Sequence, residues 1–189
     1  MESLPKDILF YLAEFFLGPI SLAKLTQCSH FYHSLFSTHS SIIKWRIYKI
    51  PNEGLYQASR SGQRDLIDLF ISKGANDWNW ALRGASRGGH RDLIELLISK
   101  GANDWNGALS YASRGGHLQL VYLLISKGAN DWNWALCAAS QGGHLHLVNL
   151  FISKGANDWD DALSGAILGG HHDIIDLFIS KGANADQTL

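Results

Sequence analysis

Four histidines recur at one position of a repeating pattern, and imidazole side chains are common metal ligands. They lie 27 residues apart, at His90, His117, His144 and His171. Zinc requires ligands that converge to about 2 Å from the ion, whereas one histidine per stacked unit would keep neighbours about a repeat apart. Gln63 occupies the same position in the first unit. We therefore expect no metal site and no cofactor, and we assign these side chains to hydrogen bonds in turns.

The sequence contains one apparent catalytic motif, because His90-Arg91-Asp92-Leu93 follows the order of a protein-kinase catalytic loop. No glycine-rich phosphate loop, strand lysine or metal-binding asparagine accompanies it. The serine, cysteine, histidine and aspartate residues elsewhere show no spacing that supports a nucleophile paired with a base. We therefore expect that this protein is not an enzyme.

Composition limits the class of partner. Hydrophobic residues make up 46% of the 189 residues and charged residues 17%, so the chain can bury a core. The formal net charge of -1 argues against nucleic acid as the main partner, because that binding depends on an excess of Lys and Arg. Cys28 and Cys137 form no CxxC pair and indicate free thiols in a reducing, intracellular compartment, cytoplasmic or nuclear. We expect neither a signal peptide nor a membrane-spanning segment, and hence no membrane partner.

The elements that must position the side chains follow a fixed repeat. A period between about 20 and 50 residues is typical of a stacked solenoid. The sequence Ser-Lys-Gly-Ala-Asn begins at Ser72, Ser99, Ser126, Ser153 and Ser180, which gives a period of 27 residues. The predicted units are 50–76, 77–103, 104–130, 131–157 and 158–184, followed by a short tail, 185–189.

Each unit is predicted to form two helices joined by a turn. In the second unit Asp77 can cap a helix that begins at Trp78, because its carboxylate accepts hydrogen bonds from free N–H groups of the first turn. Gly88-Gly89 ends this helix, and a second, mostly buried helix follows it. Gly101 then supplies a left-handed turn. One such unit cannot bury both faces of its helices, so neighbouring units must stack.

The run from Ala85 to Leu97 resembles the ankyrin repeat. It shows the family's Ala-Ala-x-x-Gly-His-x-x-Ile/Val-x-x-Leu-Leu pattern, whereas the segment 80–83 replaces the family's Thr-Pro-Leu-His opening. The ankyrin period is about 33 residues, and the roughly six residues missing here fall where ankyrins place a projecting β-hairpin. The resemblance therefore implies an all-α, ankyrin-like solenoid of five helix-turn-helix repeats that lacks β-hairpins, with a tight turn at 101–103.

Residues 1–49 lie outside the repeat and predict a small domain of three short helices. They contain, in this order, Leu-Pro, Ile-Leu, a leucine-rich helix, a cysteine near an aromatic residue, and Trp45. This order of residues resembles an F-box. Gln27 and Phe31 depart from the family, which more often has valine and tryptophan there. The resemblance implies docking to the Skp-type adaptor of a cullin–RING ubiquitin ligase. The contact residues would be Leu4, Pro5, Ile8, Leu9, Leu12, Leu22, Leu25 and Cys28. Alternatively, these helices only cap the solenoid.

Comparison of the units separates constant positions from varying ones. A constant leucine is a predicted core residue: Leu55, Leu82, Leu109, Leu136 and Leu163. A constant tryptophan, Trp78 in the second unit, is assigned to packing between repeats. The varying positions of each first helix share one face, and their Trp, Tyr and Arg side chains are typical of interface hot spots. The predicted target-binding residues are Trp80, Arg83, Arg87, Tyr111, Arg114 and Trp134. Drift on a solvated helix face is the alternative interpretation.

Together these features favour a substrate-recognition adaptor. The N-terminal box would dock to the ligase, and the solenoid would capture a target protein and raise its effective concentration there. An F-box followed by nearly identical ankyrin-type repeats is similar to proteins of large DNA viruses, which redirect ubiquitination in the host cell. A plain interaction scaffold is the alternative function, and nucleic-acid binding by the arginine and aromatic residues ranks below both. Ile167 and Leu168 form either a binding patch or an uncapped end of the array.

Overall fold

The computed structural model describes residues 51–184, and residues 1–50 and 185–189 lie outside the described part. The chain divides into two units between Pro51 and Asn52, so the described residues belong to the second unit apart from Pro51. Residues 51–184 form ten α-helices and no strand, which confirms the predicted all-α class for this part. The box predicted at 1–49 falls outside it. No helix within 51–184 has the length and apolar character that crossing a membrane requires.

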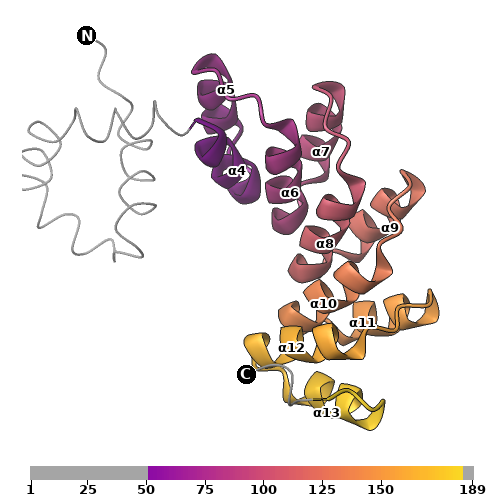
Figure 1. The fold of residues 1–189 in the computed structure, drawn as a ribbon. Coiled ribbons are helices and arrows are strands. Elements are labelled where there is room, and N and C mark those ends of the chain that lie inside the picture. Colours follow the sequence, from indigo (N-terminus) through magenta and orange to yellow (C-terminus); the bar gives the residue numbers. More distant parts are fainter. Residues whose placement is uncertain (1–50, 185–189) are drawn as a thin grey trace, which may run out of the picture. The chain divides into compact units, whose positions relative to one another are not determined.

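The helices alternate between two layers, which are visible in Figure 1. The first helices of the repeats form the A layer, on the inner side of the curve in Figure 1: α4 (Pro51–Ser61), α6 (Trp78–Gly88), α8 (Trp105–Gly115), α10 (Trp132–Gly142) and α12 (Trp159–Gly169). The second helices form the B layer: α5 (Arg64–Ser72), α7 (Arg91–Ser99), α9 (Leu118–Ser126), α11 (Leu145–Ser153) and α13 (His172–Ser180). The helices α6, α8 and α10 each pack against the next A helix, and these three and α12 also pack against the B helix of their own repeat.

The A helices begin and end as the sequence predicts. The Asp77 carboxylate accepts a hydrogen bond of 2.9 Å from the backbone N–H of Trp80 and so caps α6. Asp104, Asp131 and Asp158 make the equivalent bond at the start of α8, α10 and α12. At the other end of α6, Gly89 adopts a φ of 82°. A residue with a Cβ would be strained in this left-handed conformation, which explains why the helix ends at glycine.

The connection between repeats is a tight turn. After α7, Gly101 has a φ of 104° and its N–H donates to the Ile98 carbonyl at 2.9 Å. The Ala102 N–H donates to the Leu97 carbonyl at 3.0 Å, which closes the end of the helix. The same pair of bonds follows α5, α9 and α11. The predicted absence of β-hairpins is therefore confirmed within residues 51–184.

Leucine and aromatic side chains fill the space between the layers. The constant leucines, Leu55, Leu82, Leu109, Leu136 and Leu163, have no exposed surface, which confirms them as core residues. Two of the constant tryptophans stack on aromatic residues of the B layer: ring centroids lie 6.4 Å apart for Trp132 and Phe151, and 6.1 Å apart for Trp159 and Phe178. Both ring pairs lie within one repeat, whereas the sequence indicated packing between repeats.

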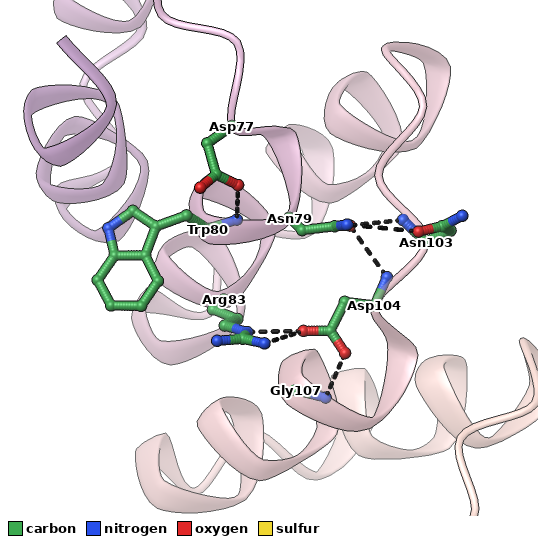
Figure 2. A network of polar contacts seen from close by, with 7 residues as sticks. All are labelled: Asp77, Asn79, Trp80, Arg83, Asn103, Asp104 and Gly107. Atoms are coloured by element: carbon green, nitrogen blue, oxygen red, sulfur yellow. Dashed lines mark hydrogen bonds and ion pairs between the residues drawn. The ribbon is translucent and has the colours of Figure 1, made fainter.

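An asparagine in the first turn of the A helices joins one repeat to the next. The Asn79 side-chain oxygen accepts from the backbone N–H groups of Asn103 and Asp104 at 2.8 Å and 3.0 Å (Figure 2). Asn52, Asn106 and Asn133 make the same pair of bonds to the repeat that follows each of them. These asparagines form a ladder along the array, which the sequence analysis did not predict.

The recurring histidines form a second ladder. His90 Nε2 lies 3.1 Å from the Arg60 carbonyl oxygen of the preceding repeat, and His117 Nε2 lies 3.0 Å from that of Arg87. His144 and His171 bond to the preceding repeats in the same way. Because a carbonyl oxygen only accepts, Nε2 carries the proton in each bond. The predicted hydrogen-bonding role of these histidines is confirmed, and it acts between repeats.

Candidate functional site

The predicted target-binding residues all belong to the A layer. Because α6 carries three of them at i, i+3 and i+7, they share one face of that helix. Their placement is Trp80, Arg83 and Arg87 in α6, Tyr111 and Arg114 in α8, and Trp134 in α10. Five of these side chains are half-buried, and Trp134 has 41% of its surface exposed.

Three rings from three successive repeats form an aromatic cluster: Tyr56, Trp80 and Tyr111. The Tyr56 and Trp80 ring centroids lie 4.7 Å apart, and Tyr111 meets Tyr56 edge-on at 6.3 Å. Such pairs contribute about 0.5–1.5 kcal/mol beyond their buried area. Tyr56 is only 6% exposed, so it supports the cluster from below, while Trp80 and Tyr111 remain half-exposed above it.

Glycine at position 84 makes the aromatic cluster possible. A Cβ on Gly84 would lie 2.5 Å from the Tyr56 carbonyl oxygen and 3.0 Å from its ring. Tyr56 and Tyr111 therefore meet across α6 at a point where that helix carries no side chain. The other repeats have Gln57, Tyr111, Ala138 and Gly165 at this position. Glycine therefore recurs in the fifth repeat, where a Cβ would lie 2.5 Å from the Cys137 carbonyl oxygen.

Arg83 is held by a carboxylate of the next repeat. Its Nε and Nη2 lie 2.6 Å and 2.5 Å from the same oxygen of Asp104, while the other Asp104 oxygen caps α8 through the Gly107 N–H at 3.0 Å (Figure 2). A Cβ on Gly107 would lie 2.5 Å from Arg83 Nε, so a larger residue at this position would displace the guanidinium group from this arrangement. The guanidinium group also lies 6.0 Å from the centre of the Trp80 ring. These contacts fix the edge of the aromatic cluster.

A second set of basic side chains, the arginine row, lies toward the C-terminal ends of the first three A helices: Arg60, Arg87 and Arg114. Arg60 is exposed and the other two are half-buried. Arg114 Nη2 donates to the side-chain oxygen of Gln141, which occupies the same position in the fourth repeat. Among the arginines of residues 51–184, ion pairs are formed by Arg64, Arg83 and Arg91, and none by Arg60, Arg87 or Arg114. No described carboxylate therefore neutralises the arginine row.

The fourth and fifth repeats present different chemistry on the A layer. Trp134 makes no ring contact with any described residue, so it stands apart from the aromatic cluster. Burial raises the pKa of the Cys137 thiol, and the nearby Asp161 carboxylate raises that pKa further. The thiol is therefore protonated and a weak nucleophile near neutral pH. Leu168 continues the position of the arginine row and is 77% exposed.

Sequence reasoning missed two residues that shape the surface, Tyr56 and Asp104. Tyr56 shares its repeat position with Arg83, and the period could have placed it beside Trp80. Asp104 occupies the capping position that was predicted at Asp77, and its bond to Arg83, 21 residues earlier, was not predicted. The predicted box contacts all lie outside the described residues: Leu4, Pro5, Ile8, Leu9, Leu12, Leu22, Leu25 and Cys28.

Comparison with known proteins identifies the repeat. A family model described as ankyrin repeats in three copies matches residues 55–133 and 109–188. The two matches together extend over more than half of the chain. Among curated proteins, no sequence matches it.

Proposed function

This chain belongs to the ankyrin-repeat family, and from that premise we propose that it captures a target protein on its A layer and presents it to a ubiquitin ligase. Ankyrin repeats form protein–protein interaction modules and typically serve as non-enzymatic scaffolds. The observation that carries the proposal for this chain is the aromatic cluster beside the arginine row. Trp, Tyr and Arg dominate the binding energy of many interfaces, and here they vary on a scaffold that otherwise repeats.

The ligase half of the proposal rests on the F-box resemblance of residues 1–49. In this role Leu9 and Leu12 belong to the apolar contact with a Skp-type adaptor, and the repeats act as the substrate receptor. The protein would perform no bond chemistry itself. It would raise the concentration of the target near the ligase, which is the usual effect of joining two binding modules. The resemblance to proteins of large DNA viruses makes a host protein the proposed target class.

Co-purification with a Skp-type adaptor tests the ligase half. We expect the wild-type chain to bind the adaptor and the double variant Leu9→Asp/Leu12→Asp to lose binding, because two carboxylates would enter an apolar contact. Leu168→Asp is a matched control, since this leucine is 77% exposed on the last repeat. The control should bind as the wild type does, and absence of wild-type binding would reject ligase docking.

A plain interaction scaffold is the second candidate, since ankyrin repeats alone support that function. In this case residues 1–49 would only cap the array and would bind no ligase subunit. The two candidate functions are distinguished by measuring adaptor binding and target capture on the same protein preparation. Target capture that is sensitive to Trp80→Ala, without any adaptor binding, would favour the scaffold.

A further inference from the structure

We infer that the arginine row and the aromatic cluster together bind an extended acidic segment of the target, with carboxylates at about every third residue. The inference rests on the proposed function in one respect, because it takes the A layer as the target surface. It adds the chemistry of the bound segment and the part of the array that binds it.

The charges of the arginine row are available to a partner. The three arginines of the described residues that form ion pairs are each satisfied within the array, by Asp68, Asp104 or Glu95. The guanidinium group of Arg114 donates to the neutral side chain of Gln141, and none of Arg60, Arg87 and Arg114 pairs with a described carboxylate. Three guanidinium groups in successive repeats without a counter-charge form a positive strip, and such a strip attracts carboxylates.

The three arginines stand in register across α4, α6 and α8. A Cβ on Gly115 would lie 2.5 Å from the Arg87 carbonyl oxygen, so the residue beside Arg114 touches the backbone of Arg87. The His90 and His117 bonds fix the same alignment, because they reach the carbonyl groups of Arg60 and Arg87. Adjacent packed helices lie about 8–10 Å apart. The arginine row therefore advances by about that distance per repeat.

This spacing selects an extended peptide. A polyproline II segment has three residues per turn and rises about 3.1 Å per residue. Three residues therefore span one repeat, and carboxylates at i, i+3 and i+6 lie on one face, where each would meet one guanidinium group. Arginine and carboxylate pair through two parallel hydrogen bonds, which favours Asp or Glu over a neutral side chain. A segment of seven residues would then cover the first three repeats.

The aromatic cluster adds an apolar requirement on one side of that segment. Tyr111 precedes Arg114 by three residues and Trp80 precedes Arg87 by seven, so the exposed rings lie about one to two helical turns from the guanidinium groups. An aliphatic or aromatic side chain placed between the carboxylates can reach them. The segment should end after the third repeat, because Gln141 and Leu168 continue the row without charge and Asp161 would repel carboxylates.

A selection with the full-length chain tests the inference. The probe is a display library of random 12-residue peptides. We expect enrichment of peptides with Asp or Glu at i, i+3 and i+6 and an apolar residue between them. For the most enriched peptide, the double variant Arg60→Glu/Arg87→Glu should weaken binding by at least tenfold. Lys100→Glu/Lys127→Glu changes the net charge equally at exposed turns and should change binding by less than twofold.

Several results would overturn the inference. One such result is that the enriched peptides lack carboxylates, or that no peptide is enriched. Another is an equal loss of peptide binding in both double variants. A third is binding of a 12-nucleotide single-stranded DNA that exceeds peptide binding and depends on Arg60 and Arg87, which would indicate nucleic acid as the partner. The proposed function fails separately, because it is measured by adaptor binding and by target capture that depends on Trp80. Capture that needs Trp80 but not the arginine row would leave that function standing without this inference.

Discussion

Single amide side chains join each repeat to the next, and Asn79 is the clearest case. Its oxygen accepts two backbone N–H bonds from the connection at Asn103 and Asp104. Asn79→Ala should lower the free energy of unfolding by about 1–2 kcal/mol, since each bond contributes about 0.5–1.5 kcal/mol and water replaces part of it. Urea denaturation measures this change. The control Gln119→Ala, at an exposed helical position, should stay within about 0.5 kcal/mol; an equal effect of both variants would contradict the role of the ladder.

His144 couples stability to pH. Burial lowers the pKa of its imidazole from the usual 6.5, its bond to the Arg114 carbonyl partly opposes this change, and the neighbouring His146 adds to the lowering. Below about pH 6.5 the folded state therefore binds fewer protons than the unfolded state. The free energy of unfolding is highest above that pH with respect to this group, and it decreases as the pH falls through it. Unfolding free energies measured between pH 7.5 and 5.5 should therefore decrease.

The variant His144→Gln is the matched comparison, because glutamine occupies this repeat position at Gln63. Its stability should depend less steeply on pH over the same interval than that of the wild type. An unchanged slope would show that other groups cause the pH dependence.

At the scale of the helix, close approach of the A helices depends on glycine. In the interior of a helix, replacing glycine by alanine normally stabilises the helix by about 1 kcal/mol. At Gly115 the sign should reverse, because the added Cβ would lie 2.5 Å from the Arg87 carbonyl oxygen and at the same distance from the His117 ring. We expect Gly115→Ala to lower the melting temperature, whereas a higher melting temperature would show that the helices can separate without loss.

The helices were predictable because their signals are local. Asp77, Gly89 and Gly101 lie within four residues of the groups to which they bond, and the 27-residue period predicts the stacking. The site was predictable in part. The positions of Trp80 and Tyr111 follow from the period, but their meeting through Tyr56 depends on the glycine at position 84, and that requires coordinates. The ladder bonds of Asn79 also join residues 24 and 25 positions apart, which a helical period does not reveal.

At the scale of the whole array, one repeat should be removable. Deletion of 104–130 joins Asn103 to Asp131 and keeps the order of cap, helices and turn. We expect a folded, helical protein with a lower free energy of unfolding, because one interface between repeats is lost. Circular dichroism with urea denaturation measures both properties. Deletion of 104–116 removes α8 alone and leaves α9 without its partner helix, so this variant should lose cooperative unfolding; equal behaviour of the two deletions would contradict independent repeats.

The last described repeat lacks the contact that covers each earlier one. A Cβ added at Gly62, Gly89, Gly116 or Gly143 would meet the histidine ring of the following repeat, whereas one at Gly170 would meet no described atom. Ile167 is exposed, while Ser59, Ser86, Ser113 and Ser140 at the same position are buried. Among the helices from α6 to α13, amide hydrogen exchange should therefore be fastest in α12 and α13. Brief opening would then begin at the end farthest from the arginine row, so the first three repeats could retain a bound segment while the fifth repeatedly unfolds and refolds.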